Sequence, residues 1–95
     1  MTKYEIMYII RPTLEAEDRE KLKNELHDIF PKFASEVVKV TTWGTRDLSY
    51  EIQKHNKGYY VILDVKATEE ARAEFDRVIR IKEDVIRYMI IKDVR

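Results

Sequence analysis

The residues of this sequence best suited to chemistry are cations that lie along β-prone segments. One group falls in residues 37–65 and consists of Arg46, Lys54 and Lys57, with His55 beside them. The other falls in the first and last apolar segments and consists of Lys3, Arg87 and Lys92. Cations on neighbouring strands can hold the phosphates of a nucleic-acid backbone. Lysines at a sheet edge can instead serve to discourage aggregation, and the sequence leaves both interpretations open.

The charges are balanced overall but unevenly distributed, with 18 basic and 18 acidic residues among 95. Residues 15–28 hold six acidic and three basic residues, a net charge of −3. Residues 39–58 hold four basic and two acidic residues, and residues 85–95 hold three basic and one acidic, a net charge of +2 in each. A local basic region can bind phosphates even in a neutral chain, although ordinary solvated charge gives the same counts.

Patterns for catalysis and metal binding are missing from the sequence. With no cysteine there is no thiolate nucleophile or zinc–thiolate site, and two glycines are too few for a phosphate-binding loop. His27 and His55 are too isolated to suggest a metal cluster, and His27, between charged neighbours, is expected to face solvent. We therefore expect no catalytic residue, metal, cofactor or small-molecule substrate, and no enzyme.

Membrane and export signals are also missing. No apolar run approaches the roughly 20 residues that span a bilayer, and the first residues lack the layout of a signal peptide. The absence of cysteine fits a reducing compartment. We expect a cytoplasmic protein that makes no membrane contact and forms one domain over residues 1–95.

Residues 37–65 predict a long β-hairpin. Two runs rich in β-branched and aromatic residues flank the polar residues 53–58. Gly58 is expected to supply the positive φ of the hairpin loop. Gly44, which lies inside a strand pattern beside Trp43, is expected to mark a bulge or bend.

The residues before the hairpin predict a strand and then a helix. Residues 4–10 are short, apolar and β-prone, and Pro12 ends the strand because proline removes a ladder donor. A helix begins at Thr13 or Glu15, and Pro31 should stop or kink it near the residue before. The apolar positions at helical spacing are Leu22, Leu26, Ile29 and Phe33.

The residues after the hairpin predict a second helix and a last strand. Thr68 is a favourable N-cap, and residues 85–94 read as the strand. The apolar stripe of the helix is Ala71, Phe75, Val78 and Ile79. The order β-α-β-β-α-β predicts an α+β, ferredoxin-like (split βαβ) fold, in which two helices cover one face of a four-stranded antiparallel sheet. The first and third strands are then central.

The face of this sheet away from the helices, the open face, is expected to be apolar. The helices should cover Ile6, Tyr8, Leu63, Val65, Tyr88 and Ile90, which leaves Met7, Ile9, Tyr60, Ile62, Met89 and Ile91 on the open face. An apolar surface of this size indicates a partner: a protein, stacked RNA bases or a second copy of the sheet. Methionine and isoleucine favour protein contact. The same fold should bring Lys3, Arg87 and Lys92 into one neighbourhood.

Three motifs in order resemble a known family. They are Tyr4-Glu5 with Arg11-Pro12-Thr13-Leu14; Trp43-Gly44-Thr45-Arg46-Asp47-Leu48-Ser49-Tyr50-Glu51-Ile52 with Lys54 and Gly58-Tyr59-Tyr60; and residues 81–92. They resemble the sixth protein of the bacterial small ribosomal subunit across essentially the whole chain. The second motif is similar to the family pattern W-G-x-R-x-L-x-Y-x-I…K…G-Y/F. Thr45 and Asp47 stand where the family often has further basic residues, which should weaken phosphate contact by the hairpin.

The resemblance implies a ferredoxin-like structural protein of translation that acts in the small ribosomal subunit. It implies binding to the central domain of 16S ribosomal RNA together with the eighteenth small-subunit protein during assembly. RNA contact is carried over onto Lys3, Arg46, Arg87 and Lys92, and contact with the partner protein onto Trp43, Leu48 and Tyr60. The alternative is a ferredoxin-like ligand-sensing or small enzymatic module that forms homodimers through the open face.

Overall fold

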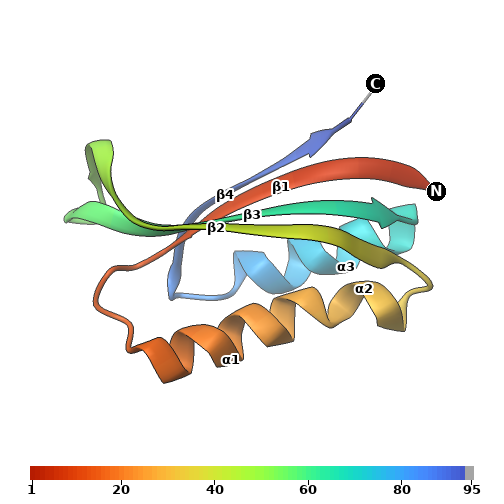
Figure 1. The fold of residues 1–95 in the computed structure, drawn as a ribbon, viewed down its shortest axis with the longest axis horizontal. Coiled ribbons are helices and arrows are strands. Elements are labelled where there is room, and N and C mark those ends of the chain that lie inside the picture. The colour runs from red at the N-terminus through yellow and green to blue at the C-terminus, as the bar shows by residue number, and fades with distance from the viewer. Residues whose placement is uncertain (94–95) are drawn as a thin grey trace.

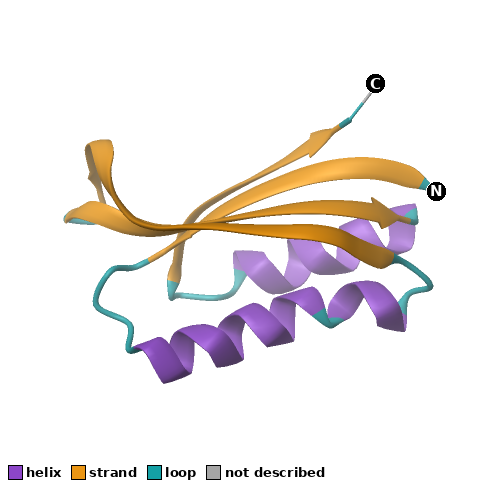
Figure 2. Ribbon diagram, in the orientation of Figure 1, coloured by secondary structure: helices purple, strands orange, loops and turns teal. Residues whose placement is uncertain are grey.

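One sheet and three helical segments make up the fold (Figures 1 and 2). The computed structural model describes residues 1–93. The elements are β1 (Thr2–Ile10), α1 (Ala16–His27), α2 (Ile29–Lys32), β2 (Glu36–Ile52), β3 (His55–Ala67), α3 (Glu69–Arg80) and β4 (Val85–Lys92). The last strand was expected over residues 85–94; it ends at Lys92, and Val94 lies outside the described residues.

The strands pair antiparallel in the order β2-β3-β1-β4, so the prediction that the first and third strands are central is confirmed. The two edge strands differ in regularity. The ladder of β2 shifts register at three places, whereas β4 pairs with β1 without a shift from Lys92 to Arg87. Figure 1 shows all the helices on one side of the sheet, as the ferredoxin-like prediction requires.

The core lies between the helices and the sheet face that alternation predicted. Ile6, Tyr8 and Leu63 are fully buried, and the Phe30 and Phe75 rings stack at 5.2 Å between α2 and α3. Tyr88 and Ile90 pack against this core from β4 and are half-buried.

The second helix begins as predicted. Thr68 is the N-cap of α3, and its hydroxyl accepts a hydrogen bond from the Ala71 amide at 3.1 Å. The Thr68 amide donates to the Ser35 hydroxyl at 3.0 Å, which ties this cap to the chain that enters β2.

The first helix breaks earlier than expected. Its two segments, α1 and α2, are separated by Asp28, which lies two residues before the expected break. The ring of Pro31 would clash with the carbonyl of His27, four residues back, so the helix must end there. Pro31 then lies in the first turn of α2, where its missing N–H needs no partner.

The hairpin turn also differs from the prediction. Ile52 pairs with His55, so the loop has only two residues, Gln53 and Lys54, with φ of 50° and 68°. This pattern of two left-handed residues follows the twist of the strands. Gly58 instead lies inside the ladder, so its predicted role in the loop is wrong. Gly44, with φ of 78° at a register shift, confirms the predicted bulge.

His27 is half-buried, and the prediction that it faces solvent is wrong. Its Nε2 lies 2.9 Å from the hydroxyl of fully buried Tyr8, which needs a hydrogen-bond partner. Burial raises the pKa of Tyr8, so its hydroxyl stays protonated and shares a hydrogen bond with the imidazole. Burial, assisted by Lys23, lowers the pKa of His27 to about 4, so the ring is neutral near pH 7.

Candidate protein and RNA interface

The open face carries the predicted apolar side chains. Met7 of β1 lies between Met89 of β4 and Ile62 of β3, and all three point away from the helices. Met89 is 37% exposed, and Ile91, two residues on, is 50% exposed. The expectation of an apolar surface opposite the helices is therefore confirmed over these residues.

Ile9 is the exception on this face, since it is only 2% exposed. The end of the β2–β3 hairpin covers it; we call residues 47–58 the hairpin tip. Figure 1 shows this part of the hairpin, in green, bending away from the helices. Gly58 permits the close approach, because a Cβ at this position would lie 2.2 Å from Cγ2 of Ile9. The glycine is thus required for packing and not for backbone conformation.

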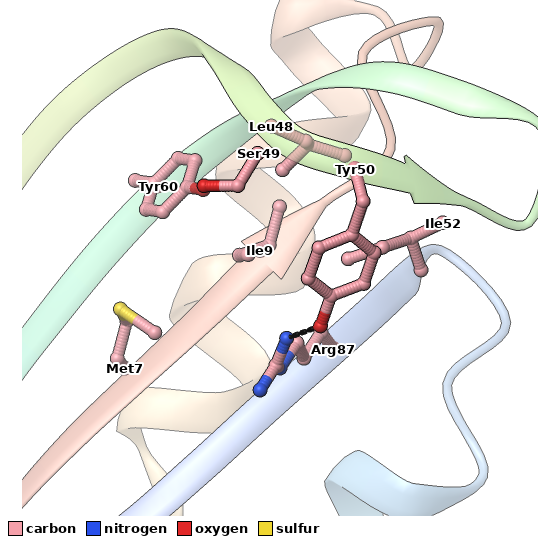
Figure 3. A pocket seen from close by; sticks show the side chains of 8 residues that line it. All are labelled: Met7, Ile9, Leu48, Ser49, Tyr50, Ile52, Tyr60 and Arg87. Atoms are coloured by element: carbon pink, nitrogen blue, oxygen red, sulfur yellow. Dashed lines mark hydrogen bonds between the residues drawn. The ribbon is translucent and has the colours of Figure 1, made fainter.

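A hollow of about 160 Å³ lies where the hairpin tip meets the sheet (Figure 3). Met7 and Ile9 line it from β1, Arg87 lines it from β4, and the tip contributes residues 48–50 and Ile52. Leu48, predicted to contact a protein partner, is half-buried and points toward Gly58. Part of its surface is therefore already buried within the tip.

Trp43 and Tyr60, the other predicted protein contacts, lie together on the open face. Their rings stack at 6.0 Å with an interplanar angle of 23°, and Trp43 remains 49% exposed. They share a second, shallower hollow with Arg46 and Asp47. The Asp47 carboxylate lies 3.9 Å from Lys57, so a cation next to it offsets its charge.

The predicted cluster of Lys3, Arg87 and Lys92 does not form. Arg87 lies opposite Ile9 and Lys92 lies opposite Tyr4, five residues along β1, which is roughly 16 Å. Lys3 is next to Tyr4 in sequence and points to the open face, like the other odd-numbered residues of β1. Lys92 points to the opposite face, like the other even-numbered residues of β4. The topology was correct, but antiparallel register sends Arg87 to the other end of the sheet.

Lys92 acts electrostatically on the helix side of the sheet. The pKa of Glu69 is lowered chiefly by the hydrogen bond from Arg72, and the charge of Lys92 contributes less. The four cations assigned to RNA therefore occupy three places: Lys3 and Lys92 at one end on opposite faces, Arg87 at the other end, and Arg46 on the hairpin. Their contact with RNA stays a prediction.

Tyr50 is a residue to which sequence reasoning gave no role. Its hydroxyl accepts a hydrogen bond from Nη1 of Arg87, and Cζ of Arg87 lies 5.9 Å from the centroid of its ring. The two residues are 37 positions apart on opposite edge strands. No local pattern could show this contact, which depends on the bend of the hairpin across the open face.

The described residues contain neither a metal site nor a membrane-spanning helix. Within residues 1–93, no group of three or more histidine, aspartate or glutamate side chains is arranged to hold a metal ion. Over the same residues, no helix has the length and apolar character needed to span a bilayer.

Comparison with known proteins connects this geometry to a family. Residues 3–92 match the family model described as ribosomal protein S6. The small ribosomal subunit protein bS6 of Onion yellows phytoplasma is 43% identical over 93 residues, and that of Halalkalibacterium halodurans is 46% identical over 93 residues. Each alignment covers 98% of this chain and 98% of the relative.

A solved structure agrees with this match. The crystal structure of 30S ribosomal protein S6 from Thermotoga maritima has a TM-score of 0.91 and 28% sequence identity to this chain. The superposition covers 97% of this chain and 87% of that one. These relatives are components of the small ribosomal subunit, a cytoplasmic particle, and are not enzymes. Because sequence and fold agree over nearly the whole chain, this protein belongs to the ribosomal protein S6 family of the small ribosomal subunit.

Proposed function

We propose that this protein binds the central domain of 16S ribosomal RNA together with the eighteenth small-subunit protein during assembly of the subunit. The observation that carries the proposal is the open face, where exposed apolar and aromatic side chains adjoin Lys3, Arg46 and Arg87. Within residues 1–93, none of these three cations forms an ion pair with a carboxylate. The family assignment argues against the alternative of a ligand-sensing or enzymatic homodimer. A size measurement of the pure protein tests that alternative directly.

The proposal divides the open face, together with Lys92 at one end of the sheet, between two partners. Trp43 and Tyr60 offer a stacked aromatic surface to the partner protein, and Leu48 adds its remaining exposed part. Aromatic side chains of this kind often dominate the energy of a protein interface. The cations Lys3, Arg46, Arg87 and Lys92 contact RNA phosphates.

The charge balance supports joint binding. The chain has no net charge, so attraction to a polyanion comes only from local cations. A partner that docks on the apolar surface adds contacts and reduces the entropy lost on binding RNA. Each partner then strengthens the binding of the other by the same factor.

Filter binding to a central-domain RNA fragment, with and without the eighteenth protein, tests this coupling. We expect weak binding of the protein alone and at least tenfold tighter binding with the partner. Tight binding to arbitrary RNA without the partner would contradict the proposal.

Substitution of the cations tests the RNA contacts. Arg46→Ala, Arg87→Ala and Lys92→Ala should each weaken RNA binding and reduce the salt slope by about one, since each removes one phosphate contact. Lys21→Ala is the matched control, because Lys21 is an exposed cation on α1, on the far side of the sheet. If a variant matches the control in both affinity and slope, that residue does not contact RNA.

Trp43→Ala tests the protein contact. It should weaken binding of the eighteenth protein by roughly 30-fold, the effect of losing about 2 kcal/mol at a central aromatic residue. Ile81→Ala is the control, because Ile81 is 67% exposed at the end of α3 and away from the open face. Equal partner affinity of the two variants would remove Trp43 from the interface.

A further inference from the structure

Arg87 differs in its partner from four of the seven arginines that the structure describes. Four arginines pair with carboxylates at 2.5–2.7 Å: Arg11, Arg72, Arg77 and Arg80. The partner of Arg87 is instead the neutral phenol of Tyr50. Within residues 1–93, no carboxylate forms an ion pair with the Arg87 guanidinium. Its positive charge is therefore held in a defined place without being neutralised.

The contact with Tyr50 leaves most of the guanidinium available. Arginine has five N–H donors, and one of them, on Nη1, is used on the Tyr50 hydroxyl. Four donors remain, which are enough for bidentate contact with an anion. An anion can therefore bind Arg87 while Tyr50 stays in place.

Tyr50 reaches Arg87 only because the hairpin tip crosses the sheet. β2 and β4 are the two edge strands, with β3 and β1 between them. Figure 3 shows the Tyr50 ring extending from the tip to Arg87. The packing of Gly58 on Ile9 holds the tip in this position. The place of Arg87 thus depends on how the tip lies on the sheet.

We propose that Arg87 forms a phosphate site on the open face and that Tyr50 is the positioning residue that holds its guanidinium there. This inference rests on the proposed function, since the phosphate belongs to RNA. Tyr50 carries no charge, so it contributes by reducing the side-chain entropy that Arg87 loses when it binds. That entropy is about 0.5–1.5 kcal/mol for a long side chain, which corresponds to roughly 2- to 12-fold in affinity.

RNA binding by the complex with the eighteenth protein provides the first test. Tyr50→Phe removes the hydrogen bond and keeps the ring, so it should weaken binding by about threefold; Tyr50→Ala removes both contacts and should weaken it by about tenfold. Neither change should alter the salt slope, whereas Arg87→Ala should lower the slope by about one. A lower slope in Tyr50→Phe would overturn the positioning role.

A double-mutant cycle separates positioning from a general structural role. In an Arg87→Ala background, Tyr50→Phe should change RNA affinity by less than about twofold, because no guanidinium is left to position. A threefold loss that persists in this background would show that Tyr50 acts independently of Arg87 and would overturn the inference. The inference is also overturned if Arg87→Ala weakens binding of the partner protein in the absence of RNA, because Arg87 would then contact a carboxylate of that protein.

Inorganic phosphate gives a readout that does not need RNA. Phosphate titrated into the free protein should shift the side-chain NMR signal of Arg87, and the midpoint should lie several-fold higher in Tyr50→Phe. Arg46, which has no such partner among the described residues, is the internal control. The phosphate midpoint of its signal should be the same in the parent protein and in Tyr50→Phe. Equal Arg87 midpoints in the two proteins would overturn the inference even if RNA binding by the complex is intact. Unequal midpoints with no RNA binding would leave it standing while the proposed function fails.

Discussion

The two faces of the sheet carry similar side chains but differ in how far other segments of the chain bury them. Along β1, Ile6 and Tyr8 point to one face, and Met7 and Ile9 point to the other. The helices form one layer that covers the first face, where Ile6 and Tyr8 are fully buried. The second is covered only where the hairpin tip folds over Ile9, and Met7 stays half-exposed. Alternation therefore decides which face a residue joins, while burial depends on which other segment of the chain reaches it.

The difference separates stability from binding. Burial of apolar surface contributes roughly 25 cal/mol per Å² wherever it occurs, but on the open face the second surface must come from a partner. Substitutions beneath the helices should thus lower stability, and substitutions on the open face should lower affinity. The predictions below test this separation.

The largest expected effect comes from the covered face. Phe75 is fully buried against Phe30, so Phe75→Ala should lower the free energy of unfolding by about 3–5 kcal/mol. Met89→Ala, on the open face, should lower it by less than about 1 kcal/mol. Urea denaturation measures both. Similar losses for the two variants would mean that the open face also belongs to the folded core.

Gly58→Ala should have an intermediate effect on the free energy of unfolding, because it should separate the hairpin tip from Ile9 on the open face. Its methyl group would meet Cγ2 of Ile9, so the hairpin tip must lift, at a cost of about 1–3 kcal/mol. Ile9→Ala removes Cγ2, and the double variant should therefore recover part of the loss. Both can be measured by urea denaturation.

Gly44→Ala is the control for this test. A Cβ at Gly44 meets nothing within 4 Å, so its cost, about 1 kcal/mol, is that of a positive φ and should not depend on Ile9. If Ile9→Ala improved both glycine variants equally, contact with Gly58 would not be the reason for its effect.

The smallest expected effect is a pH dependence beneath the helices. His27 has a folded-state pKa of about 4, below the ordinary value of 6.5, so the unfolded chain binds more protons between these values. Stability is fully present above pH 7 and falls as the pH drops toward 4. The loss should be on the order of 1 kcal/mol, since the half-buried ring keeps part of its hydration.

Urea midpoints at pH 7 and pH 5 measure this loss. Glu20 and Asp28, which favour the charged ring, and Lys23, which opposes it, stay in place in every variant. His27→Gln should reduce the difference between the stabilities at the two pH values. An unchanged difference in His27→Gln would assign the pH dependence to other groups.

The features that sequence predicted well depend on local chemistry or strict alternation. Thr68 caps α3 because its hydroxyl meets an amide three residues away, and Gly44 marks a bulge because it takes a positive φ. The strand order follows from element order and the known packing of such units. The three motifs alone indicate the family that the comparisons confirm.

The features that it missed depend on contacts between distant segments. Gly58 looked like a turn residue, but its lack of a side chain serves Ile9, 49 positions away in the chain. His27 looked solvent-facing because its sequence neighbours are charged, whereas its partner is Tyr8. The predicted cation cluster does not form, because residues on neighbouring strands can lie at opposite ends of the sheet. Only the register of the strands decides at which end each residue lies.

The regular outer edge of β4 affects how the protein can associate with other chains before it is part of a ribosomal subunit. Tyr88 to Ile91 form an uncharged, β-prone run at an edge that no described strand covers, whereas the bulges of β2 blunt the opposite edge. Such an edge can pair with another chain, and the flanking charges of Arg87 and Lys92 oppose that pairing. Copies that are not assembled into a subunit keep this edge open, so any pairing between them should increase steeply with concentration.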